Sequence, residues 1–120
     1  MRFMVLVKAN AESEQAKVPN RADMREMGKF NQQLIDAGVL LDANGLKASK
    51  FGARIELGGG KPRVIDGPFA EAKELVAGYW IWQCKDLDEA IAWAKRCPDP
   101  HAGGGQLEIR PIWELSEIPE

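Results

Sequence analysis

The chain has 120 residues, of which 45% are hydrophobic and 28% charged, proportions typical of a folded globular protein and not of a disordered one. The formal net charge of -2 and the scattered Lys and Arg residues argue against nucleic acid as a partner. No segment resembles a signal peptide or approaches the apolar length that spans a membrane, so we expect a cytoplasmic protein with no membrane partner.

The N-terminal part of the chain predicts a strand followed by a helix. Arg2–Lys8 is rich in Val and Phe and predicts a strand, and the polar residues 9–18 predict a loop. A helix is predicted from Asn20, its N-cap, to about Ala37, and Gly38 is typical of the position after a helix end. Its apolar residues recur every three or four positions: Met27, Phe30, Leu34 and Ala37.

The middle of the chain predicts short extended segments and tight turns. Residues 39–41 form a short extended piece, followed by a turn at Asn44-Gly45. Residues 53–57 and 62–65 are joined by three consecutive glycines, which predicts a hairpin.

The C-terminal half predicts a loop, a strand, a helix and a last strand. A loop over residues 66–74 precedes the strongest predicted strand, residues 78–84. The second helix begins at Asp86, with Glu89 three residues later as a reciprocal capping box. A last strand is predicted at residues 106–113.

The order of these elements predicts an α+β fold in one domain, residues 1–120. It is the ferredoxin-like order, an antiparallel sheet with two helices on one face. In that arrangement the first strand and the strand before the second helix lie at the centre of the sheet.

Both predicted central strands are apolar on both faces. One face of residues 78–84 would carry Trp80, Trp82 and Cys84, and the other would carry Tyr79 and Ile81. Two helices cover only one side of a sheet, and an open antiparallel face in water would show polar alternation. The open face either binds a large apolar partner or packs on a second copy. We expect a homodimer, because small oligomers are mostly self-complementary dimers.

Residues 66–74, with the sequence DGPFAEAKE, resemble the loop that defines DGPF-domain proteins within the YCII-related family. The resemblance extends to residues 37–40, 78–80 and 94–98 and to His101. It implies a dimeric α+β barrel fold, and it brings no settled activity. Because proteins of this kind are often encoded beside extracytoplasmic-function sigma factors, it also implies a sigma factor as a partner.

The wider family implies a His and Asp pair as reactive groups, and Asp66 and His101 fit that pair in this chain. Asp66 also has a structural interpretation, since Asp-Gly-Pro favours a turn closed by the Asp side chain. His101 is the only histidine and lies in a Pro- and Gly-rich loop, where it would otherwise cap the end of the second helix.

Five further residues are candidates for binding a substrate near the loop. Glu71, Lys73 and Glu74 place carboxylates beside a lysine, a grouping whose pKa values shift when it is enclosed and which is otherwise a solvated polar loop. Arg54 or Lys73 would hold an anionic group of a substrate. Trp80 would line a pocket, or else belong to the core or to an interface.

Other kinds of site find little support in the sequence. One His and two distant cysteines, Cys84 and Cys97, give no metal-ligand spacing, and we expect neither a metal nor a cofactor. Both cysteines are predicted to be small, apolar, reduced residues.

The sequence thus predicts a homodimer with a cleft near residues 66–74 that takes a small molecule of unknown identity. One interpretation is cofactor-free acid–base chemistry of lyase, isomerase or hydrolase type, with Asp66 or His101 moving the proton. The alternative is a non-catalytic binding or regulatory module, linked to a sigma factor. A purely structural dimer is a third interpretation.

Overall fold

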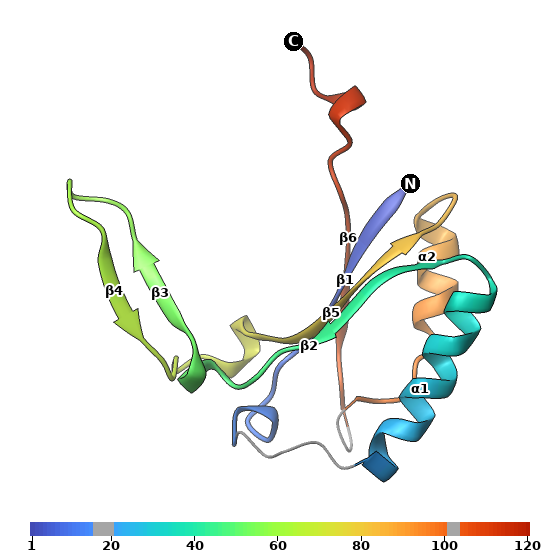
Figure 1. Cartoon of the computed structure of the whole chain (residues 1–120), viewed down its shortest axis with the longest axis horizontal. Helices are drawn as coiled ribbons and strands as arrows, with labels where there is room; N and C mark the ends of the chain where they lie inside the picture. The colour runs from blue at the N-terminus through green and yellow to red at the C-terminus, as the bar shows by residue number, and fades with distance from the viewer. Residues whose placement is uncertain (16–20, 101–103) are drawn as a thin grey trace.

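The computed structural model describes residues 1–15, 21–100 and 104–120. Its main sheet has four antiparallel strands in the order β2-β5-β1-β6 (Figure 1). They are β1 (Arg2–Lys8), β2 (Leu40–Gly45), β5 (Val76–Gln83) and β6 (Leu107–Pro111). The prediction that β1 and β5 are the central strands is confirmed.

Helices α1 (Arg21–Asp36) and α2 (Leu87–Ala94) lie on the same face of this sheet (Figure 1), which confirms the predicted α+β class. The core forms where the helices meet the sheet, and its largest members are fully buried. Its residues come from β1 and β5 (Phe3, Val5, Trp80, Trp82), from the helices (Phe30, Leu34, Ala90) and from the segments just before β2 and just after β5 (Val39, Cys84).

The two predicted helix N-termini have different outcomes. The α2 N-cap is confirmed, because the Asp86 carboxylate accepts a hydrogen bond from Glu89 N at 2.9 Å. The Glu89 carboxylate, however, accepts from Lys85 N and not from Asp86 N, so the reciprocal half of the predicted capping box is wrong. The predicted α1 N-cap, Asn20, lies outside the described residues.

Strand β2 corrects the prediction of a turn at Asn44-Gly45. Both residues belong to the strand, where Asn44 pairs with Tyr79 and Gly45 with Gly78 of β5. Pairing with a central strand thus overrides a local turn preference.

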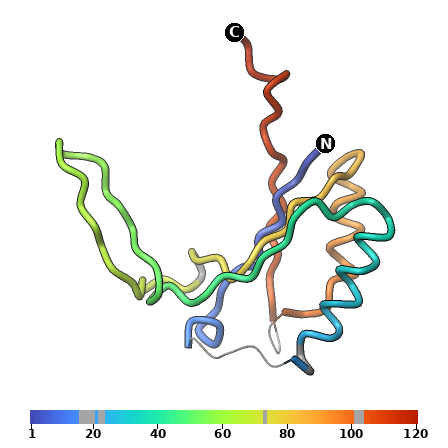
Figure 2. Tube along the Cα trace, viewed as in Figure 1, coloured from blue at the N-terminus to red at the C-terminus, as the bar shows by residue number. Residues whose placement is uncertain are grey.

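The predicted hairpin is confirmed as β3 (Ala53–Glu56) and β4 (Arg63–Asp66). These strands form a separate two-stranded sheet that projects from the body, on the side of the main sheet away from the helices (Figures 1 and 2). We call residues 53–66 the arm. All of its strand residues are exposed.

A C-terminal segment, residues 112–120, projects on the same side of the sheet (Figure 2). Its base is fixed by Arg2, whose guanidinium donates two hydrogen bonds to Glu114 at 2.9 and 3.1 Å. These hydrogen bonds lower the pKa of Glu114. The predicted last strand extends to residue 113, but β6 ends at Pro111, and Trp113 is 73% exposed.

The face of the main sheet away from the helices is the open face. Two rows of side chains cross it through paired residues of the four strands. The first row is Asp42, Ile81, Met4 and Arg110, and the second is Asn44, Tyr79, Leu6 and Glu108. The described part of the chain has no helix long and apolar enough to cross a membrane.

Candidate functional site

Asp66 ends β4 at the base of the arm, opposite Ala53. Its side chain is exposed, and it makes no hydrogen bond to a described residue, so the predicted turn closed by this carboxylate is not observed. The bond between Gly67 and Pro68 is cis. A Cβ atom on Gly67 would lie 1.8 Å from Ser49 O, so the backbone passes there too closely for any side chain.

Ser49 anchors the loop that follows. Its Oγ accepts a hydrogen bond from Phe69 N at 3.0 Å, and Ser49 itself lies in a short 3-10 helix, Ser49–Phe51. The Ser49 hydroxyl donates to the Glu14 carboxylate, which also accepts from Ser49 N at 3.1 Å. Glu14 and Ser49 thus tie the loop to the N-terminal part of the chain, a contact that the sequence analysis missed.

The charged candidates near the loop do not form an enclosed cluster. The Arg54 guanidinium lies 3.8 Å from the centre of the Phe69 ring, a cation–π contact that binds the arm to the loop. Glu71 and Glu74 are exposed. Lys73 lies in the short helix Ala72–Glu74, and its side chain is outside the described residues, as is the whole of His101.

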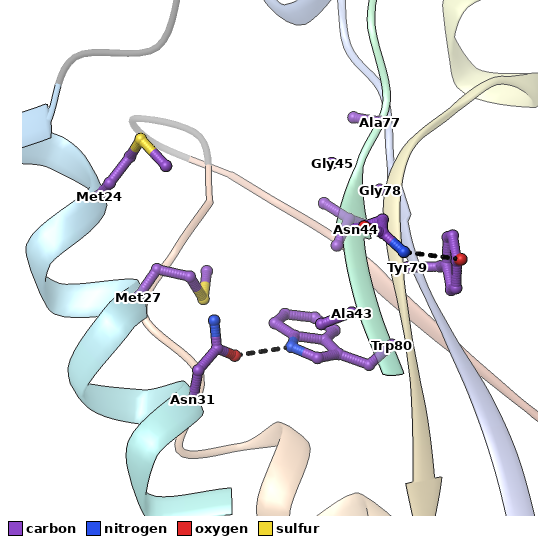
Figure 3. A pocket seen from close by; sticks show the side chains of 11 residues that line it. Met24, Met27, Asn31, Ala43, Asn44, Gly45, Ala77, Gly78, Tyr79 and Trp80 are labelled. Atoms are coloured by element: carbon purple, nitrogen blue, oxygen red, sulfur yellow. Dashed lines mark hydrogen bonds between the residues drawn. The ribbon is translucent and has the colours of Figure 1, made fainter. Parts of the chain in front are cut away.

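A pocket lies elsewhere, between α1 and the sheet (Figure 3). It has a volume of about 260 Å³ and sits where β2 ends and β5 begins. Its walls are mostly apolar, and none of the described residues that line it is charged. They come from β1 (Val7), α1 (Met24, Met27, Asn31), β2 (Ala43, Asn44, Gly45) and the β5 region (Ala77, Gly78, Tyr79, Trp80).

Trp80 and Asn31 are the polar centre of this pocket. The Trp80 indole points from β5 toward α1 and donates from Nε1 to Asn31 Oδ1 at 2.8 Å (Figure 3). Trp80 also packs edge-to-face on Phe30, with ring centres 6.0 Å apart, which fixes the ring plane. The Asn31 amide nitrogen donates to no described residue, so it remains free to bind a ligand.

Tyr79 and Asn44 contribute backbone to the pocket, but their side chains point to the open face (Figure 3). There the Tyr79 hydroxyl donates to Asp42 at 3.1 Å and accepts from Asn44 Nδ2 at 3.0 Å. The Tyr79 phenol is therefore directed away from the pocket, and among the described lining residues it is the one ionisable side chain.

The predicted site residues are thus divided between two places in the described structure. Trp80 lines the pocket. Asp66, Arg54, Glu71 and Glu74 lie in the arm and its loop and are not among the residues that line it. Sequence reasoning missed Asn31. It lies four residues after Met27, on the predicted apolar stripe of α1, and this position indicates a polar group that faces the core.

The two cysteines are free thiols. Burial raises the pKa of Cys84 to about 11, with Glu89 adding to the effect, and burial beside Asp99 raises that of Cys97 to about 11. Both thiols are protonated at neutral pH, the opposite of what a nucleophilic cysteine requires. Within residues 1–15, 21–100 and 104–120, no group of three or more potential ligands is placed to hold a metal ion.

Comparisons with known proteins cover nearly the whole chain. A family model, the YCII-related domain, matches residues 1–116. The uncharacterized protein R00369 of Rhizobium meliloti (strain 1021) is 31% identical over 98 residues, which are 80% of this chain and 79% of the relative. A solved structure, the 5-chloro-2-hydroxyhydroquinone dehydrochlorinase TftG of Burkholderia phenoliruptrix AC1100 in complex with 2,5-dihydroxybenzoquinone, shares the fold with a TM-score of 0.53. It is 14% identical, and the match covers 99% of this chain and 100% of that one. The chain therefore belongs to the YCII-related family.

Proposed function

We propose that the protein is a homodimer whose pocket between α1 and the sheet binds a small, flat, uncharged organic molecule. The observation that carries this proposal is the pocket itself, about 260 Å³ of mostly apolar space with the Trp80–Asn31 pair at its centre. Drug-sized ligands occupy pockets of roughly 300–1,000 Å³, so this volume suits a compound of about one ring. Trp80 supplies an apolar surface, and the Asn31 amide supplies a hydrogen-bond donor.

The two asparagines of the pocket give a matched test. We use hydroquinone as the probe, because it is an uncharged, flat, one-ring compound related to the 2,5-dihydroxybenzoquinone of the structurally similar dehydrochlorinase complex. Asn31→Ala should weaken its binding about tenfold through loss of a hydrogen-bonding side chain. Asn44→Ala should leave binding unchanged, since the Asn44 side chain lies on the other face of the sheet. Titration calorimetry measures both, and equal losses in the two variants would contradict the proposed site.

A second candidate is cofactor-free acid–base chemistry of lyase, isomerase or hydrolase type. It is favoured by the fold shared with a dehydrochlorinase. In this proposal Asp66 or His101 moves the proton, and Arg54 or Lys73 holds an anionic group. Asp66→Asn and His101→Ala would then abolish turnover without affecting probe binding.

The remaining alternative is a regulatory module that binds its ligand without changing it. That alternative, with its sigma-factor partner, rests on the family resemblance. It fits a pocket whose described lining has no charged side chain, because acid–base catalysis needs a titratable group at the substrate.

A further inference from the structure

The hydrogen bond between Trp80 and Asn31 fixes which end of the Asn31 amide faces the pocket. An indole N–H donates and cannot accept, so the amide oxygen of Asn31 is the atom that meets Trp80 Nε1, at 2.8 Å. The indole is buried and lies against the rings of Phe30 and Trp82, with ring centres 6.0 and 5.6 Å away. The Asn31 amide nitrogen is therefore turned away from the Trp80 ring, to the side of Met27 (Figure 3).

Among the described lining residues, the Asn31 amide nitrogen is the one side-chain donor left for a ligand. The side chains of Tyr79, Asn44 and Asp42 bond to one another on the open face. Apart from Trp80, the other lining residues have aliphatic side chains, methionine thioethers, which accept hydrogen bonds only weakly, or in glycine no side chain. A ligand oxygen would thus gain a donor, whereas a ligand N–H or O–H would lose water and find no strong side-chain acceptor.

Two facing glycines give the pocket a floor without side chains. Gly45 of β2 pairs with Gly78 of β5, and both residues line the pocket. The Asn44 side chain points to the open face, so a side chain at residue 45 would point to the opposite, helix-covered face (Figure 3). A Cβ atom on Gly45 meets nothing within 4 Å. The glycine pair therefore keeps open a space in which a flat ring can lie.

We propose that the pocket selects flat, uncharged carbonyl compounds, with the Asn31 amide nitrogen donating a hydrogen bond to the carbonyl oxygen. Asn31 is then the residue that determines specificity, and Trp80 positions its amide. The inference rests on the proposed function, because it assigns a class of ligand to the same pocket. Hydroquinone has hydroxyl groups that both donate and accept, so its binding tests the pocket and not this selectivity.

Acetophenone and indole distinguish an acceptor from a donor in the wild-type protein. Both compounds are flat, uncharged and equal in their number of non-hydrogen atoms, but acetophenone offers a carbonyl oxygen and indole offers an N–H. Acetophenone should bind about tenfold more tightly than indole in titration calorimetry. Equal affinities, with hydroquinone still bound, would overturn the carbonyl selectivity and leave the proposed function standing.

Asn31→Asp should reverse the preference. The carboxylate has nearly the shape of the amide and still accepts from Trp80 Nε1, but it presents an acceptor to the pocket in place of a donor. Acetophenone should bind about tenfold more weakly than to the wild type, and indole about tenfold more tightly. Parallel losses for the two compounds would mean that Asn31 only supports the structure, and would overturn the inference.

Gln33→Glu is the matched control for the added charge. It makes the same amide-to-carboxylate change on α1, at a side chain that contacts Arg96 and does not line the pocket. Both affinities should stay as in the wild type. A reversal of preference in this variant as well would assign the effect to charge alone and overturn the role of Asn31.

Gly45→Val separates the pocket from its selectivity. The Gly45 backbone is not left-handed, so valine suits this strand position, and its side chain would fill the floor. Hydroquinone, acetophenone and indole should all bind about tenfold more weakly or worse. Unchanged hydroquinone binding would place the ligand elsewhere, and would overturn the proposed function together with the inference.

Discussion

Gly67 shows how one residue without a side chain decides how the arm joins the body. The Ser49 carbonyl occupies the space where a Cβ atom of residue 67 would lie. Two residues later, Phe69 N donates a hydrogen bond to the Ser49 hydroxyl. The glycine of the Asp-Gly-Pro sequence is therefore required by packing, while the aspartate before it is exposed. The two residues of one sequence motif thus have different physical roles.

We predict that Gly67→Ala lowers the free energy of unfolding by about 2 kcal/mol or more, because the backbone must move away from Ser49. Gly58→Ala is the control, since a Cβ atom there meets nothing within 4 Å, and it should change stability by about 0.5 kcal/mol at most. Urea unfolding of both variants measures the difference. Equal effects at the two positions would show that the Ser49 contact does not constrain the fold.

Cys84 gives a prediction about pH. Burial raises its pKa from the ordinary value of 9.0 to about 11, so the folded chain keeps a proton that the unfolded chain releases above pH 9. The contribution of Cys84 to the free energy of unfolding is therefore fully present below pH 9. It is lost as the pH rises toward 11, by at most about 1.4 kcal/mol per pH unit. Cys84→Ala should be less stable at pH 8, yet lose less stability between pH 8 and 10.5 than the wild type. Identical pH slopes in urea unfolding would refute this.

At the scale of elements, helices and strands with a clear apolar pattern could be predicted from the sequence. The pairing of distant segments and the position of the hairpin could not. Strands β1 and β5 follow from runs rich in β-branched and aromatic residues, and the helices follow from apolar residues at helical spacing. The turn predicted at Asn44-Gly45 was wrong because cross-strand pairing with β5 outweighs local preference. The hairpin was predicted, but no local pattern encodes that it leaves the main sheet.

The same limit applies to the candidate site. For Trp80 the sequence left two interpretations open, a pocket residue or a residue of the core or an interface, and in the structure it belongs to the buried core and also lines the pocket. The Glu14–Ser49 contact joins residues 35 positions apart, so no spacing rule could indicate it. Asn31 and Met24 became pocket residues only when the packing of α1 against the sheet was known.

At the scale of the whole molecule, the shape and the exposed apolar surface indicate a missing partner. The chain extends over 48 × 46 × 19 Å, with the arm and the C-terminal segment standing away from the body (Figure 1). Exposed large apolar side chains lie in both, including Leu57, Val64, Trp113 and Leu115. A soluble monomer rarely leaves so much apolar surface in water, and a second copy on the open face would cover it.

Sedimentation equilibrium at low micromolar concentration tests this central claim most directly. The chain mass is 13.3 kDa, and we expect the protein to sediment at twice this value. Ile81→Glu, which places a charge at the apolar centre of the open face, should shift it toward the monomer or reduce its solubility. A folded wild-type protein that sediments at 13.3 kDa would contradict the homodimer.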